Sequence, residues 1–284
     1  MNLAVREPEN APRTAGNLLF SRAFQVGASQ IIRKCTRFLF FFFAARKLGP
    51  TVFGVYALLL AIVETLALIS GEGVVDYLTR EVSKTPALGG ALYAKVIQLR
   101  LLYVVLLFVP AMVCLRILKY PDEILTDASL LFLTLFPRAV LGAGQGVLRA
   151  VGRFGLLVFL ETLQGLLLLG VGASLLSKTH DLRGVIWAEV ASAFAAGLGA
   201  IFMVRGLRQP KLKSAISWRQ VIRDTSVFNV YPLITNIYDR VDVILLSALA
   251  GSLAVGIYAV PYRALSAIQI LPFAILSALL PAIA

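Results

Sequence analysis

Residues 99–118 read LRLLYVVLLFVPAMVCLRIL, a run of twenty residues whose only charges are two arginines near its ends. A helix needs roughly 20 apolar residues to cross a bilayer core about 30 Å thick. Strong apolar segments of this kind recur at 52–71, 128–148, 156–177, 184–205, 227–249 and 254–282, and a more polar one spans 17–46. The sequence therefore predicts an all-α polytopic membrane protein with about eight transmembrane helices.

The overall composition supports this class of protein. Hydrophobic residues make up 59% of the 284 positions, charged residues 15%, and the mean hydropathy is +0.85. A soluble domain is nearer 45–50% apolar and about 25% charged. The net charge of +12 would suggest nucleic acid as a partner of a soluble protein. In a membrane protein, Lys and Arg collect in the cytoplasmic loops, so we expect no nucleic-acid partner.

Basic residues are distributed unevenly between the two sides of the predicted helices. With the N-terminus placed inside, the tail and the loops after the second, fourth and sixth helices hold fourteen Lys and Arg, against six on the other side. This bias predicts a cytoplasmic N-terminus. The segment 72–96 alternates apolar and charged residues at near-helical spacing, and we expect it to form an amphipathic helix at the cytoplasmic surface.

Few residues are suited to catalysis or to metal binding. His180 is the only histidine, and Cys35 and Cys114 form no CxxC pair, whereas zinc sites need three or four clustered ligands. The long loops contain no Ser/His/Asp set and no glycine loop that could cradle a phosphate. We therefore expect a protein that is not an enzyme and that carries no cofactor and no metal.

An internal repeat organises the chain. Residues 48–57 read LGPTVFGVYA and residues 250–259 read AGSLAVGIYA, so an offset of 202 aligns Gly49 with Gly251 and Tyr56 with Tyr258. Each copy follows the first helix of a six-helix set, and six intervening helices give both copies the same orientation in the membrane. Such a parallel repeat favours a substrate path between two lobes.

The repeat predicts how the chain divides. Residues 1–16 form a cytoplasmic tail, 17–205 a six-helix lobe, 206–218 a basic cytoplasmic linker, and 219–284 the first two helices of a second, truncated lobe. A GxxxG motif, Gly142 to Gly146, is interpreted as a helix-packing site.

The first helix carries a polar stripe. At 100° per residue, one face about 120° wide contains Arg22, Gln25, Ser29, Arg33, Thr36 and Arg37. An ionisable group in hydrocarbon costs several kcal/mol unless it faces a cavity or a partner. The stripe is therefore interpreted as a cationic wall for an anionic substrate. In the alternative interpretation, Arg22 snorkels to the interface and the other residues pair locally.

The seventh helix shows a similar pattern. Asn229, Asn236 and Arg240 share a narrow stripe, with Asp239 and Asp242 nearby. We expect this stripe to bind substrate as well. The alternative is that one of the two aspartates neutralises Arg240.

Other charges lie within the predicted spans. Arg263 on the eighth helix is a further candidate for substrate binding. Arg138, Glu64, Glu161 and Glu189 stand alone within their helices, where an inter-helix pair is the favoured interpretation and a coupling or gating role the alternative. Glu64 is kept as a coupling or gating candidate, together with the two aspartates of the seventh helix.

The segments 44–70 (AARKLGPTVFGVYALLLAIVETLALIS) and 242–284 (DVILLSALAGSLAVGIYAVPYRALSAIQILPFAILSALLPAIA) resemble the oligosaccharide flippases, the Wzx-type polysaccharide transporters. That family shares the MOP superfamily with the lipid II flippase MurJ and the MATE antiporters. The motifs A-R-x-L-G-P-x-x-F-G-x-Y and G-x-x-x-x-G-x-Y-A-x-x-Y-R carry the resemblance.

The resemblance implies two six-helix lobes around a central cationic cavity in the bacterial inner membrane. The implied cargo is a polyprenyl-pyrophosphate-linked oligosaccharide for O-antigen, lipopolysaccharide, capsule or exopolysaccharide, flipped by alternating access. Membrane lipid and the polymerase or glycosyltransferase machinery are the implied partners. By position, Arg22, Arg46 and Arg263 are most like the family's cavity cations, although Arg46 could instead cap the turn before Gly49.

Two other functions are kept. A MATE-like antiporter of organic cations would want a carboxylate-lined cavity. A truncated chain could instead be an inactive membrane fragment, because the family's members carry twelve to fourteen helices.

Overall fold

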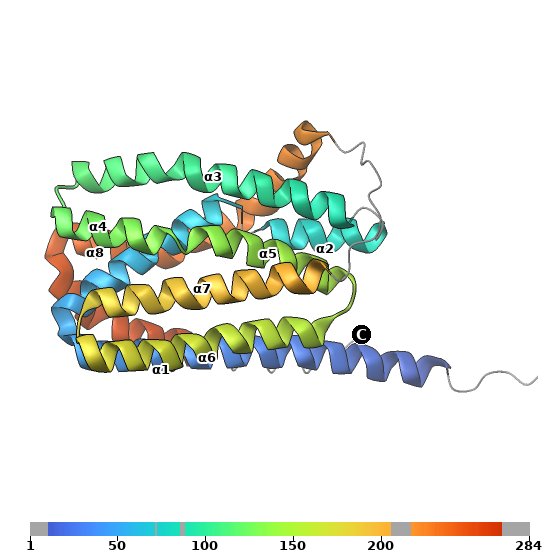
Figure 1. Cartoon of the computed structure of the whole chain (residues 1–284), viewed down its shortest axis with the longest axis horizontal. Coiled ribbons are helices and arrows are strands. Elements are labelled where there is room, and N and C mark those ends of the chain that lie inside the picture. The colour runs from blue at the N-terminus through green and yellow to red at the C-terminus, as the bar shows by residue number, and fades with distance from the viewer. Residues whose placement is uncertain (1–10, 72, 86–88, 206–216, 269–284) are drawn as a thin grey trace, which may run out of the picture.

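A computed structural model of the chain (Figure 1) describes residues 11–71, 73–85, 89–205 and 217–268. The side chains of residues 11–30, and of several positions between 227 and 237 and after 265, lie outside this description. The described residues form the helices α1 (Ala11–Ile69), α2 (Val74–Lys84), α3 (Gly89–Ile117), α4 (Asp122–Phe132), α5 (Leu135–Ala150), α6 (Phe154–Thr179), α7 (Leu182–Arg205) and α8 (Trp218–Ile268). The prediction of an all-α polytopic protein is confirmed.

The two longest helices each contain a sharp turn at a glycine. Gly49 in α1 has φ 73° and ψ 167°, and Gly251 in α8 has φ 78° and ψ 179°. Only glycine adopts this region of backbone space without strain. Both helices turn back on themselves at the same end of the molecule, on the left in Figure 1.

These turns account for the number of membrane passes. Among the described residues, six stretches are long and apolar enough to cross a membrane. Two of them, Ile31–Lys84 and Tyr238–Leu265, contain a glycine turn. Taking the two sides of each turn separately divides these six stretches into eight helical segments, the predicted number, of which the last is described as far as Ile268.

The repeat copies contact each other reciprocally. A Cβ atom built on Gly54 would lie 1.8 Å from the carbonyl oxygen of Ser252, and one built on Gly256 would lie 1.8 Å from that of Pro50. With the offset of 202, Ser252 is the equivalent of Pro50, so each copy makes the same contact with the other. This reciprocity is the signature of a two-fold relation, and it confirms the repeat.

The amphipathic segment is placed differently from the prediction. Its helical part is α2, which ends at Lys84, while residues 89–96 belong to α3. The break comes at Thr85, which has φ −140° and ψ 82°, because the residue before a proline disfavours helical geometry.

The structure shows what covers the apolar face of α2. Its apolar face packs on α5 and α3, and the Thr79 hydroxyl donates a hydrogen bond of 3.2 Å to the carbonyl oxygen of Gly146. In Figure 1, α2 runs beside α3 and continues the course of α1. The apolar face of α2 is therefore covered by other helices of the bundle.

The span predicted at 128–148 consists of two helices, α4 and α5, separated by Leu133 and Thr134. Pro137 follows the break and has no N–H to donate to the preceding turn. The GxxxG motif of α5 packs as predicted. A Cβ on Gly146 would lie 2.8 Å from that of Leu78, and one on Gly142 would lie 2.4 Å from Nη1 of Arg100.

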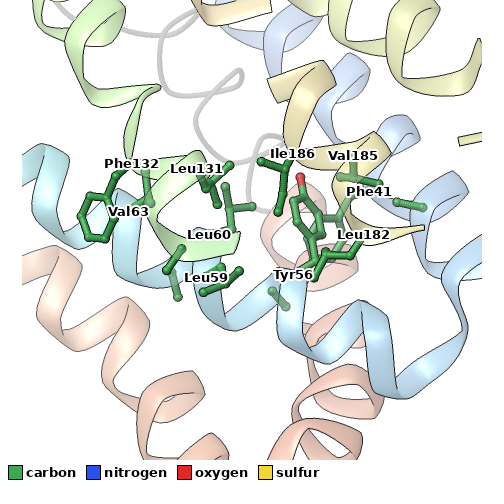
Figure 2. Packing of buried hydrophobic residues seen from close by; sticks show 14 of the residues in the cluster. Phe41, Tyr56, Leu59, Leu60, Val63, Leu131, Phe132, Leu182, Val185 and Ile186 are labelled. Carbon is green, nitrogen blue, oxygen red and sulfur yellow. The ribbon is translucent and has the colours of Figure 1, made fainter. Parts of the chain in front are cut away.

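The largest apolar core lies around the part of α1 after its turn (Figure 2). Apolar residues of α1 there pack against α4 and α7. The labelled members are Phe41, Tyr56, Leu59, Leu60, Val63, Leu131, Phe132, Leu182, Val185 and Ile186. This core fixes the helix that carries Glu64.

Candidate functional site

A cavity of about 370 Å³ lies among α1, α2, α3, α5, α6 and α8. Among the described residues, its charged lining is strongly one-sided, with seven basic side chains and a single carboxylate, that of Glu64. The basic residues are Arg33, Lys34, Arg37, Arg100, Arg138, Arg240 and Arg263. Two glutamines, Gln145 and Gln164, add neutral polar groups.

Glu64 is the centre of an arginine cluster. Its Oε2 atom pairs with Nη2 of Arg240 and lies 3.5 Å from Nη2 of Arg263. Its Oε1 atom lies 3.5 Å from Nη2 of Arg37. Three guanidinium groups from two helices therefore converge on one carboxylate.

Glu189 on α7 forms a second centre behind the first. Its Oε1 atom accepts a 2.7 Å hydrogen bond from the Tyr56 hydroxyl and lies 3.5 Å from Nη2 of Arg37, while Oε2 lies 3.9 Å from Nη2 of Arg138. Its side chain is only 2% exposed. Arg37 touches both carboxylates and so joins the two centres.

We define the cavity cluster as Arg37, Arg138, Arg240, Arg263, Glu64 and Glu189. Four guanidinium groups against two carboxylates leave two net positive charges. Removing one partner of such a group in an apolar setting leaves a charge uncompensated, at a cost of about 3–5 kcal/mol. The cluster is therefore internally stabilised and still attractive to an anion.

The favoured interpretation of the isolated carboxylates and of Arg138 as members of inter-helix pairs is confirmed. Glu64, Glu189 and Arg138 pair within the cluster. Glu161, also 2% exposed, accepts a hydrogen bond of 3.4 Å from the side-chain amide of Gln145.

Several predicted site residues come together. Arg37, Arg240, Arg263 and Glu64 meet in the cavity cluster, and Arg33 lines the same cavity. The partner of Arg240 is thus a carboxylate on another helix and not a neighbouring aspartate. The side chains of three further candidates, Arg22, Asn229 and Asn236, lie outside the described residues.

Other predicted residues lie elsewhere. Arg46 is exposed, and its guanidinium lies over the Phe42 ring, 6.0 Å from the centroid. Asp242 accepts a hydrogen bond from the Tyr258 hydroxyl, and the backbone carbonyl of Asp239 accepts one from the Tyr262 hydroxyl. Neither aspartate is a lining residue of the cavity.

The sequence did not single out Arg100 as a site residue. It lies near the start of the predicted span 99–118, but α3 begins earlier, at Gly89, and buries this side chain to 2% exposure. Its Nη1 donates a hydrogen bond of 3.3 Å to the carbonyl oxygen of Ala139. Gly142 leaves room for this side chain, because a Cβ atom there would lie 2.4 Å from that Nη1 atom. A glycine at this position of α5 is the sequence feature that fits a buried Arg100.

Glu189 was interpreted as a structural partner, and its contact with Tyr56 was not predicted. In the sequence, Tyr56 stands out only because it aligns with Tyr258 in the internal repeat. Its equivalent, Tyr258, also donates to a carboxylate, that of Asp242. A tyrosine at this repeat position is therefore a signal for an acidic partner nearby.

The protein was compared with families, curated proteins and solved structures. The sequence model of the family described as "Polysaccharide biosynthesis protein" matches residues 21–284. The comparison with curated proteins gives no match. A solved structure described as the inward-facing conformation of a multidrug resistance MATE family transporter of the MOP superfamily superposes with a TM-score of 0.59 at 16% identity.

That superposition covers 85% of this chain and 57% of the transporter chain. At this identity the likeness establishes the fold, an all-α membrane fold of the MATE type. The family match extends over nearly all of the sequence, from the first helix onward. The chain therefore belongs to the polysaccharide biosynthesis protein family.

Proposed function

We propose that the protein is a flippase that moves a polyprenyl-pyrophosphate-linked oligosaccharide across the bacterial inner membrane for surface polysaccharide. In this proposal the N-terminus is cytoplasmic, and polymerase or glycosyltransferase machinery supplies and consumes the cargo. Alternating access of the two repeat lobes carries the pyrophosphate past the cavity cluster.

The observation that carries the proposal is the charge of the cavity. In the described part of the chain, seven basic side chains line it against one carboxylate. Charges within a membrane protein are costly and mark substrate or ion pathways. A cavity with this balance attracts an anion and disfavours a cation.

The chemistry of the cargo fits the cluster. A pyrophosphate esterified at both ends carries one negative charge on each phosphoryl group, and the cavity cluster has two net positive charges. Guanidinium groups bind phosphate oxygens through paired, charge-assisted hydrogen bonds. The cluster can thus hold the pyrophosphate while the rest of the cargo lies elsewhere.

The same observation argues against the antiport of organic cations. Such a substrate needs free carboxylates, whereas the Glu64 carboxylate already contacts three guanidinium groups.

The reciprocal contact of Gly54 and Gly256 brings the two copies together near their turns, which fits alternating access with that end closed.

Binding of a defined lipid tests the proposal. Purified protein in nanodiscs would be titrated with undecaprenyl pyrophosphate, with undecaprenol, and with tetraphenylphosphonium as an organic cation. We expect the pyrophosphate lipid to bind at least about tenfold more tightly than the neutral lipid, a difference of about 1.4 kcal/mol. Equal affinity for the two lipids, or saturable binding of the cation alone, would contradict the proposal.

A further inference from the structure

The two carboxylates of the cavity cluster differ in their surroundings. Glu189 is 2% exposed, is held by the Tyr56 hydroxyl at 2.7 Å, and is not a lining residue of the cavity. Glu64 lines the cavity, its side chain is 17% exposed, and its contacts among the described residues are with guanidinium groups. Glu189 is therefore a fixed anchor, whereas Glu64 is placed to exchange partners.

The ion pairs of Glu64 also join the repeat copies. Glu64 and Arg37 belong to α1, whereas Arg240 and Arg263 belong to α8, one on each side of the turn at Gly251. These pairs add charged links to the packing of α1 against α8. A group that replaced the Glu64 carboxylate would remove them.

A carboxylate and a phosphate compete for the same donors. Both accept two parallel N–H···O hydrogen bonds from one guanidinium group, and both bind in the plane of that group. Arg240 and Arg263 direct Nη2 atoms at one oxygen of Glu64. An incoming phosphoryl group therefore gains these donors only as Glu64 gives them up.

From this arrangement, and resting on the proposed function, we infer that Glu64 is the resident anion of the pyrophosphate subsite. Its carboxylate occupies the position of a phosphoryl group while the cavity is empty. The cargo displaces it from Arg240 and Arg263 and thereby breaks the charged links between the copies. When the cargo leaves, Glu64 returns and resets the cluster.

Glu64→Gln separates this role from a merely structural one. The neutral amide competes poorly for guanidinium groups, so we expect undecaprenyl pyrophosphate to bind about tenfold more tightly. Polysaccharide export in the native host should fall at least about tenfold, because the cargo is released slowly and the links do not re-form. An ion pair that only stabilised the fold would lower both quantities.

Glu161→Gln is the matched control. It neutralises a buried carboxylate that contacts Gln145 and not the cluster, and we expect the affinity to stay within twofold of wild type. Glu64→Asp supplies a second variant, because its shorter side chain keeps the charge but reaches the arginines less well. We expect intermediate tightening, and this variant decides the matter if the Gln variant does not fold.

The outcomes distinguish the two proposals. If the wild-type protein binds undecaprenyl pyrophosphate no better than undecaprenol, the proposed function fails. If the wild-type protein binds the pyrophosphate lipid selectively, but the folded Glu64 variants bind it equally or more weakly, the resident-anion inference alone is overturned. Equal tightening by Glu161→Gln would also overturn it, because the effect would then be one of general charge.

Discussion

Export of surface polysaccharide is expected to fall by about 10–100-fold when Arg263 is replaced by alanine in the native gene. The guanidinium of Arg263 lines the cavity, lies 3.5 Å from Glu64, and stands 4.9 Å from the centroid of the Phe41 ring. A hydrogen bond to a charged group is worth about 1.5–3 kcal/mol, and each 1.36 kcal/mol changes a rate about tenfold. Immunoblots or chemical assay of the exported polymer would measure the loss.

Two further variants make this result specific. Arg263→Lys keeps the charge but not the planar fork, so we expect export between that of the alanine variant and that of wild type. Arg116→Ala removes a guanidinium whose side chain is 78% exposed, and export should be unchanged. Wild-type export from Arg263→Ala, at equal protein level in the membrane, would show that the cavity cluster does not hold the cargo.

The second large effect concerns the contact between the repeat copies. Gly256→Ala places a Cβ atom where the carbonyl oxygen of Pro50 lies 1.8 Å away, so the two backbones must separate. Overpacking of a well-packed site costs about 1–3 kcal/mol and occasionally more, and contact with backbone cannot be relieved by a rotamer change. We expect a lower midpoint of thermal unfolding in detergent and a loss of export.

Gly170→Ala is the control for this effect. Gly170 also lies within a helix, α6, but a Cβ there meets nothing within 4 Å, and the thermal midpoint of this variant should equal or exceed that of wild type. Gly54→Ala tests the symmetry, because its Cβ would lie 1.8 Å from the carbonyl oxygen of Ser252. Equal midpoints for wild type, Gly54→Ala and Gly256→Ala would contradict the reciprocal contact.

The local features of the fold were predictable from the sequence. The length of the apolar segments predicts the membrane passes. A glycine at the same place in two similar segments predicts the turns at Gly49 and Gly251. Both turns have positive φ, a property set by the residue itself. The repeat needed only a comparison of the chain with itself.

The placement of α2 could not be predicted in the same way. Its periodicity shows that one face is apolar, but a period does not say whether lipid or protein covers that face. The neighbours of α2 on α5 and α3 come from residues far along the chain. The same limit placed Arg100 near the end of a predicted span, whereas α3 begins at Gly89 and buries it.

The candidate site was predictable in its charges but not in its pairs. The cost of an ionisable group in a membrane identified Arg37, Arg240, Arg263 and Glu64 from the sequence. Which carboxylate meets which arginine depends on the rotation and packing of α1 against α8, and these come only from the three-dimensional structure. Arg46 is also an arginine of α1, but it lies close to the turn at Gly49, and its guanidinium lies over the Phe42 ring and not in the cavity.

Movement of a lipid-linked oligosaccharide between leaflets tests the central claim most directly. Vesicles would contain the protein encoded by the native gene and a fluorescent undecaprenyl-pyrophosphate oligosaccharide, with the outer-leaflet fraction followed by quenching. We expect the wild-type protein to equilibrate the lipid between leaflets, and the variant Arg37→Ala/Arg240→Ala/Arg263→Ala to leave it at the rate of protein-free vesicles. Equal equilibration by the wild-type protein and this folded triple variant would contradict the account.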